Sequence, residues 1–263
     1  MALQKDNQNY TLGRGEFHFA RFLPGTRTPK DYIYFGNTPE INISVEIEML
    51  DHYDSDHGIR EKDDSMTLQV NRTGSFTTDN IKVHNIALFY FGTVNVVTTA
   101  AAAAVEETLT DVVLDASYQL GVTPSNPLGL GGLDEAAITV AVGATTHVVD
   151  VDYKVYARTG MIKILSTGTI AAGSDVEVTY TVKASTKNRI ISGSQPVEGA
   201  VKYISFNPKG GQQDYFMPFV KLTPNGDYAL KGDEWQTIPF TLDIQKLGNL
   251  EAVYVDDEPL FTV

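Results

Sequence analysis

The chain has 263 residues, enough for one large domain or two small ones with a buried core. It carries 20 Lys and Arg against 33 Asp and Glu, a formal net charge of −13, which argues against binding nucleic acid through a broad cationic surface. It has no cysteine, which excludes disulfides, thiolate nucleophiles and thiolate zinc sites. The amino-terminal residues lack the apolar segment of an export signal, and no apolar run approaches the roughly 20 residues of a membrane-spanning helix, so we expect a soluble, non-exported protein.

Alternating apolar and polar residues predict an antiparallel hairpin early in the chain. In residues 41–49 every second side chain is apolar, and the alternation resumes in residues 66–71. Each strand is expected to be half-buried, with its apolar face packed on a second sheet and its polar face in water. Further strands are predicted at residues 201–206, 219–222 and 238–245.

One short amphipathic helix is predicted after the hairpin. The Thr, Thr and Asp side chains of residues 77–79 could cap its free amides, and Gly92 would end it. The alanine run of residues 100–104 favours helix, but its neighbours favour strand, so the sequence predicts neither there.

A change in composition marks an inserted module. Ala, Val, Thr and Gly dominate there, and strand-like runs follow at short spacing. These runs are residues 138–142, 147–156, 161–165 and 176–182. We therefore predict a discontinuous β-sandwich from residues 1–97 plus 189–263, interrupted by a small β-rich module of residues 98–188.

The most polar stretch, residues 51–64, joins the two strands of the predicted hairpin. A hairpin needs only about 2 to 5 loop residues, so this length requires an explanation. An EF-hand is excluded because Gly58 falls at position 5, not 6, counted from Asp54. We favour a protruding loop whose charges meet a partner subunit. Two alternatives stay open: a metal site at His52 and His57, and a mobile solvated loop. The contact candidates are Asp51, His52, Tyr53, Asp54, Asp56, His57, Arg60, Glu61, Lys62, Asp63 and Asp64.

Motifs for catalysis or cofactor binding are weak. The glycine run of residues 129–132 has Asp134 where a dinucleotide fingerprint needs its third Gly, and no βαβ pattern surrounds it. The many carboxylates make acidic pairs expected by chance. Trp235 could stack on a sugar, but we favour core packing beside the final strand. The sequence thus predicts no catalytic, cofactor-binding or metal-binding residues and no enzyme activity.

Several segments carry a family resemblance. Residues 36–40 (Gly-Asn-Thr-Pro-Glu) lead into the alternating strand, which ends in residues 46–55, and residues 58–63 (Gly-Ile-Arg-Glu-Lys-Asp) follow. Later come residues 214–227, with the phrase Asp-Tyr-Phe-Met-Pro-Phe-Val-Lys-Leu-Thr-Pro-Asn-Gly-Asp, and residues 231–236 (Lys-Gly-Asp-Glu-Trp-Gln). These segments, in this order, resemble the tail tube (major tail) proteins of long-tailed, non-contractile bacteriophages, the siphophages. Chi-like phages are the candidate source. The likeness covers about residues 10–95 and 188–250.

The resemblance implies a tail-tube-type β-sandwich with a flanking helix, assembled into hexameric rings. The rings would stack into a hollow tube for DNA ejection, in a virion tail assembled in the bacterial cytoplasm. The implied partners are other copies of the chain and the tape-measure, tail terminator and distal tail proteins. Duplex DNA would pass through without specific binding, and no cofactor or membrane insertion is implied.

The polar face of the predicted hairpin suits the lumen of such a tube. Lys or Arg side chains facing inward would hold phosphates, so a conduit for DNA should lack them. The lumen-facing candidates, none of them basic, are Asn42, Ser44, Glu46, Glu48, Thr67, Gln69 and Asn71. The loop of residues 51–64, at the tip of the hairpin, is then expected to contact the neighbouring ring.

Two other functions stay open. A non-enzymatic carbohydrate- or cell-surface-binding β-sandwich would be a monomer with exposed aromatic side chains. An acid/base hydrolase would hold two carboxylates about 5 to 10 Å apart in a cleft.

Overall fold

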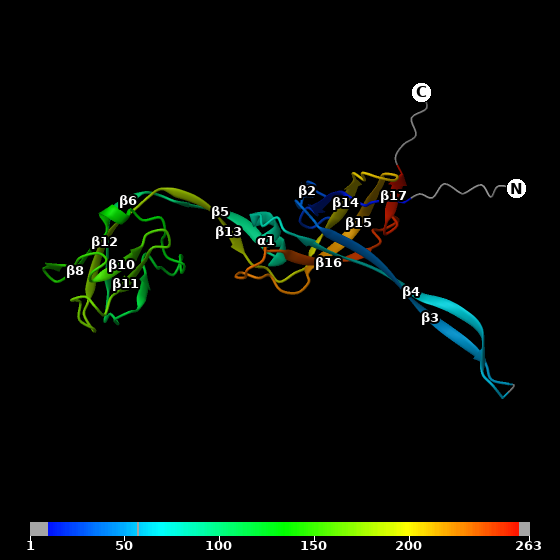
Figure 1. Ribbon diagram of the computed structural model, residues 1–263, viewed down its shortest axis with the longest axis horizontal. Helices are drawn as coiled ribbons and strands as arrows, with labels where there is room; N and C mark the ends of the chain where they lie inside the picture. Colours follow the sequence, from blue (N-terminus) through cyan, green and yellow to red (C-terminus); the bar gives the residue numbers. More distant parts are fainter. Residues whose placement is uncertain (1–9, 57, 258–263) are drawn as a thin grey trace, which may run out of the picture. The chain divides into compact units, whose positions relative to one another are not determined.

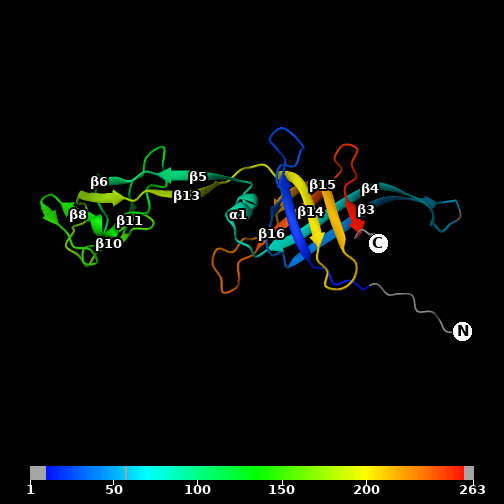
Figure 2. The ribbon, with the colours of Figure 1, turned by 90° about the horizontal axis from the view of Figure 1, so that it is seen from above.

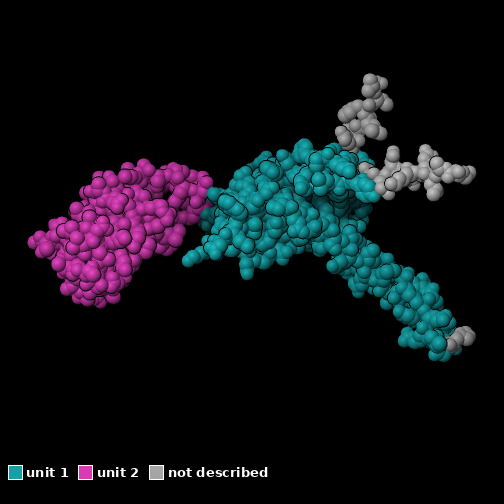
Figure 3. Space-filling model, in the orientation of Figure 1, with its two compact units in different colours: residues 1–95, 190–263 teal, residues 96–189 magenta. Residues whose placement is uncertain are grey.

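The computed structural model describes residues 10–56 and 58–257, and these residues are mainly β. The chain divides into unit 1, residues 1–95 with 190–263, and unit 2, residues 96–189 (Figure 3). The prediction of a mainly β fold with one short α-helix is confirmed. No helix in the described part of the chain is long and apolar enough to cross a membrane.

Unit 1 is built on one large antiparallel sheet (Figure 1). Its elements are β1 (Gly15–Arg21), β2 (Ile33–Tyr34), β3 (Glu40–Asp54), β4 (Glu61–Thr78), α1 (Val83–Phe89), β14 (Val197–Ser205), β15 (Gln213–Pro224), β16 (Ile238–Gln245) and β17 (Tyr254–Asp257). The strand order is β2-β1-β14-β15-β16-β4-β3, and β17 pairs with β15. The strands β5 (Thr93–Thr99) and β13 (Ser185–Ile191), which contain the two unit boundaries, form a separate two-stranded sheet.

The sheet of unit 1 curls onto itself around an aromatic core (Figure 2). Phe17 on β1 and Phe76 on β4 have ring centroids 4.5 Å apart, although three strands separate β1 from β4 in the sheet. In a flat sheet, four strand spacings of about 4.8 Å would hold them roughly 19 Å apart. The two ends of the sheet therefore face each other as the layers of a sandwich, with Phe35 and Phe240 between them.

Helix α1 begins later than the sequence predicted. Thr77 and Thr78 are the last residues of β4, and the residue before the helix is Lys82, whose side chain forms no cap hydrogen bond. The Thr78 hydroxyl instead donates to the carbonyl of Phe35 at 3.3 Å. The predicted capping position is thus wrong, because a hydroxyl that could cap a helix is used to hold the chain after β2.

Unit 2 is a small β-rich body with its own core. Its strands are β6 (Ala102–Leu109), β7 (Ser117–Gln119), β8 (Thr139–Val142), β9 (Thr145–Thr146), β10 (Tyr153–Tyr156), β11 (Met161–Ile164) and β12 (Val176–Val182), and η1 (Glu135–Ala137) is a 3-10 helix. They form the sheets β6-β12-β8-β9 and β10-β11-β7. Both sheets contribute to one core, for example through Ile164 on β11 and Val178 on β12, each 0% exposed.

The strand predicted at residues 147–156 is only partly right. The chain is extended in β10, but residues before it form a turn around the buried carboxylate of Asp152. That carboxylate accepts hydrogen bonds from the backbone N–H of Val148 at 2.8 Å and of Thr169 at 2.7 Å. A buried carboxylate requires hydrogen-bond donors, and the turn brings these two backbone N–H groups within reach of it.

Candidate assembly surface

The strands β3 and β4 pair along their whole length and form a long hairpin, here called the arm (Figure 1). In the space-filling view its distal half stands clear of the rest of unit 1 (Figure 3). The predicted pairing is confirmed, but residues 51–64 are not one long loop. Pairing continues to Asp54 and Glu61, so the connection spans only residues 55–60.

One face of the arm is polar at its base. Cross-strand neighbours in an antiparallel pair lie on the same face of the sheet, and Glu46 lies opposite Asn71 while Glu48 lies opposite Gln69. The alternation of β3 puts Asn42 and Ser44 on this same face. These six candidate side chains therefore share a surface, as the sequence predicted.

Thr67 does not belong to that surface. The register shifts by one residue between Glu48 and Met49, leaving Leu68 as the extra residue of β4, and Thr67 then lies opposite Met49. The inclusion of Thr67 is therefore a wrong prediction, because a β-bulge moves every residue beyond it to the other face.

The opposite face of the arm is apolar and uncovered. Val45 is 57% exposed, Ile47 58% and Met49 52%. Val70, which pairs with Ile47, is also exposed. The expectation that this face packs on a second sheet of the same subunit is wrong beyond the base of the arm, where Ile41 still packs against the core.

The arm is apolar on its other face too, beyond the bulge. Leu50 and Met66 lie directly opposite each other and are both exposed. By the alternation of β3, Leu50 shares its face with Glu48. The distal arm therefore offers apolar contact on the face that is polar at the base.

The charges near the tip are largely paired within the arm. Lys62 Nζ lies 2.6 Å from Asp51 Oδ1, which raises the pKa of Lys62, and the guanidinium of Arg60 lies over the ring of Tyr53. His52 Nδ1 lies 2.5 Å from Asp63 Oδ1, and this hydrogen bond lowers the pKa of the Asp63 carboxyl. The Lys62–Asp51 ion pair therefore needs no partner subunit to neutralise it, and Asp63 has a hydrogen-bond partner within the arm.

The remaining tip candidates make local contacts or fall outside the description. Asp54 Oδ1 accepts from the backbone N–H of Asp56, Asp64 Oδ1 from that of Ser65, and Glu61 pairs with Asp54 in the ladder. His57 lies outside the described residues. Among the residues that are described, no group of three or more His, Asp or Glu side chains is placed to hold a metal ion.

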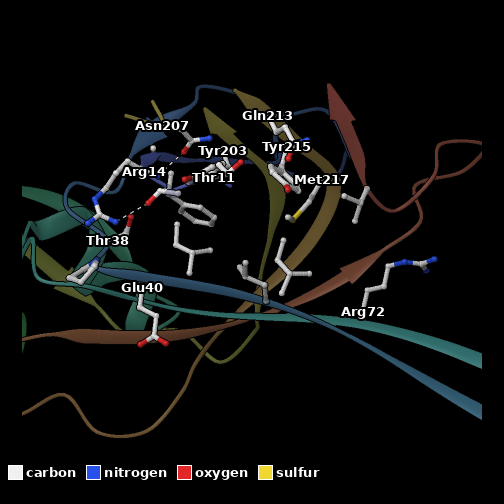
Figure 4. Close-up of a pocket in the computed structure, with 18 of the residues that line it drawn as sticks. Thr11, Arg14, Thr38, Glu40, Arg72, Tyr203, Asn207, Gln213, Tyr215 and Met217 are labelled. Atoms are coloured by element: carbon white, nitrogen blue, oxygen red, sulfur yellow. Dashed lines mark hydrogen bonds between the residues drawn. The ribbon is translucent and has the colours of Figure 1, made fainter. Parts of the chain in front are cut away.

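A groove of about 1000 Å³ lies between the two layers of unit 1 and runs onto the apolar face of the arm (Figure 4). Its walls carry aromatic and aliphatic side chains, with Arg14 and Arg72 toward opposite ends in this view. The apolar lining includes Phe17, Ile41, Ile43, Val45, Tyr203, Tyr215, Met217 and Leu242. Groove and arm thus form one continuous apolar surface.

Residues 10–246 match the model of the family described as Protein of unknown function UCP028589. The chain belongs to this family. The matched range includes both strands of the arm, the whole of unit 2, and β16. No curated protein matches the chain.

Two observations concern the other functions considered from the sequence. Trp235 is 95% exposed, so the expectation that it packs in the core is wrong. Among the described residues that line the groove, Glu40 is the one carboxylate. Sequence reasoning missed the groove altogether, because it forms between strands that are distant in the chain.

Proposed function

We propose that this chain is the structural subunit of a phage tail tube, which polymerises with copies of itself into stacked rings around a channel for DNA. The observation that carries the proposal is the uncovered apolar surface of the arm. The resemblance of residues 10–95 and 188–250 to siphophage tail tube proteins supplies the ring and tube architecture. It also supplies the virion location and the tape-measure, terminator and distal tail proteins as partners.

The size of the uncovered surface favours assembly. Eight large apolar side chains of the arm are exposed. They lie on both faces of the arm, and the five on the face of Val45 present on the order of 450 Å² at about half exposure each, within the roughly 300 to 600 Å² of the largest, often functional, patch on a typical monomer. This is about half of the roughly 800 Å² that each partner gives to a stable interface. The eight side chains are Ile43, Val45, Ile47, Met49, Leu50, Met66, Leu68 and Val70.

The sheet of unit 1 has edges that can join. Among the described strands, β3 ends the sheet on one side, and on the other side β1 is covered only by the two residues of β2. An open edge is a template for pairing with another chain. If the β3 edge of one copy meets the β1 edge of the next, the contact is head-to-tail, and such contacts form a ring when the rotation between copies closes.

The polar face at the base of the arm suits a channel wall. Its members, for example Asn42, Ser44 and Glu48, are neutral or acidic, so they offer phosphate no cation to bind. Across β16 and β15 the ladder continues through Asp243 to Lys221, whose ammonium lies 4.0 Å from a carboxylate oxygen of Glu198. Lys221, the nearest basic residue along this ladder, thus has a carboxylate, that of Glu198, beside it.

Electron microscopy of the purified chain tests the proposal. Negative-stain images should show rings or tubes with a central channel wide enough for duplex DNA, whose diameter is about 20 Å. Dispersed particles of one chain each, at concentrations from micromolar upward and across a range of salt, would contradict it. Mass photometry of the same samples gives the number of chains in each particle.

A second candidate function is carbohydrate or cell-surface binding, which the exposure of Trp235 favours. An exposed indole ring can stack on a sugar face. The chain contains one Trp, so quenching of its fluorescence by a panel of bacterial-surface glycans would report binding directly. A monomer whose emission responds to a glycan would support this candidate over the tube.

A further inference from the structure

The loop between β15 and β16 presents the most exposed large apolar side chain of the described residues. Trp235 is 95% exposed, and Leu230 in the same loop is 74% exposed. Trp is the residue most enriched at the energetic centres of protein interfaces, where it is buried by the partner. Two such side chains on one loop therefore indicate a contact that the isolated subunit does not make.

The loop is held in place at its base. The Gln236 side-chain amide donates to the carbonyl of Ala229 at 3.0 Å and accepts from the Tyr228 hydroxyl at 3.3 Å. The ring of Tyr228 packs against the core and lies edge-on to Phe89 of α1, with centroids 5.8 Å apart. A loop anchored in this way loses little conformational freedom when its tip is bound.

The groove of unit 1 complements this loop in chemistry. Its aromatic and aliphatic walls suit an indole ring, and its volume of about 1000 Å³ leaves room for the Leu230 side chain as well. Asp233 and Glu234 directly precede Trp235, whereas Arg14 and Arg72 line the groove with a single acid, Glu40. Acidic loop and basic groove therefore attract each other.

We propose that Trp235 of one copy inserts into the groove of a second copy, with Asp233 and Glu234 facing Arg14 and Arg72. This inference rests on the proposed self-assembly and names one contact between the copies. It makes the interface head-to-tail, because loop and groove are different surfaces of the same chain. Trp235 is then an anchor whose environment changes from water to an apolar groove on assembly.

The single Trp makes the first test direct. Emission of the free subunit should be that of a water-exposed indole, and it should move to shorter wavelength in assembled particles separated by size. Trp235→Ala should abolish assembly without lowering the melting temperature of the subunit, because the side chain is exposed. Leu128→Ala, which removes an exposed apolar side chain from unit 2, is the matched control and should assemble normally.

The second test identifies the groove as the binding site. The chain has no cysteine, so Glu234→Cys and Gln213→Cys variants, the latter at the groove, can be mixed and oxidised. A disulfide-linked dimer should form in the mixture and not when Leu128→Cys replaces Glu234→Cys.

The outcomes separate the two proposals. Assembled particles whose Trp emission stays at the free-subunit position, or that give no cross-link at the groove, would overturn this inference and leave the tube subunit standing. Chains that never assemble would overturn both.

Discussion

Strand β12 of unit 2 and strand β3 of the arm have the same alternating pattern but opposite environments. In β12, Val176 and Val178 are 0% exposed, whereas Val45 and Ile47 in β3 are 57% and 58% exposed. In unit 2 a second sheet, containing Ile164, covers the apolar face of β12. In the arm, the described residues of the same chain provide no such layer. Alternation therefore predicts the strand and its faces, but it does not reveal whether the cover comes from the same chain or from another.

Apolar core side chains of unit 2 are buried within the subunit, whereas the apolar side chains of the distal arm are not. Burying one large aliphatic side chain contributes about 1.5 to 3 kcal/mol. Unit 2 gains this contribution on folding, while the distal arm can gain it only on association. Substitutions in unit 2 should therefore act on folding, and substitutions in the apolar face of the arm should act on assembly.

Among substitutions in the arm and in unit 2, the largest effect is expected for Ile47→Lys. An unpaired ammonium buried in an interface costs about 3 to 5 kcal/mol, so the association constant should fall by roughly 100-fold or more. Folding should be unaffected, because Ile47 is 58% exposed in the subunit. Sedimentation velocity and thermal melting measure the two properties on the same sample.

Glu48→Lys is the control for Ile47→Lys. It places the same charge one residue along β3, on the polar face. Assembly of this variant should be retained. Equal loss of assembly in both variants would show that the difference between the faces of the arm has no role.

A cavity in unit 2 should have the converse effect. Ile164→Ala removes a 0% exposed side chain from its core, and such truncations cost about 2 to 5 kcal/mol. At about 3 kcal/mol, amides of residues 96–189 that exchange through unfolding of this unit should exchange roughly 100-fold faster with solvent hydrogen. Hydrogen-exchange mass spectrometry of the full chain measures this. Unchanged protection in unit 2 would refute the assignment of its core.

Glu48→Lys also tests the polar face as a channel wall. Lys side chains repeated along a channel would bind phosphates with release of counterions, so assembled tubes should retain duplex DNA at low salt and release it as salt rises. Wild-type tubes should not retain DNA. Co-sedimentation with short duplexes at several salt concentrations measures the difference, and Glu48→Gln separates the added charge from the lost one.

The smallest effect concerns the buried carboxylate of unit 2. The N–H groups of Val148 and Thr169 lower the pKa of Asp152 from 3.8 to about 2. The ionised carboxylate therefore stabilises unit 2 above pH 3.8, and this contribution is lost as the pH falls from 3.8 to about 2. In Asp152→Asn the carboxamide oxygen can still accept one of these hydrogen bonds, but the NH₂ group that replaces the second oxygen cannot accept the other.

Calorimetry at pH 7 should show a lower melting temperature for Asp152→Asn than for wild type. The difference should shrink as the pH falls from 3.8 to about 2. A difference that is the same at every pH would contradict the role of the charge.

The pairing of β3 with β4 was predictable, because both segments alternate between apolar and polar residues and they follow each other in the sequence. The errors have a different origin. The connection after Asp54 is shorter than predicted because charged residues such as Lys62 pair across the ladder, so a polar composition does not mean a loop. Thr67 was put on the wrong face because a one-residue bulge leaves no local signal in the sequence.

Trp235 was expected in the core because large aromatic residues usually are buried. Its exposure depends on how the β15–β16 loop is anchored through Tyr228 and Gln236, contacts that the order of residues does not reveal. The groove, and with it the candidate partner surface for Trp235, was likewise not predictable, because its walls come from β1, β3, β4, β14, β15 and β16.

Alternation of apolar and polar residues and the position of turn residues are local features of a sequence. The order of residues was therefore enough to establish a β-rich chain whose long hairpin has a polar and an apolar face. Whether those faces are covered depends on packing between distant segments. The curl of the sheet, the bulge, the open groove and the bare apolar arm follow from that packing, and they became visible once the strands were arranged in space.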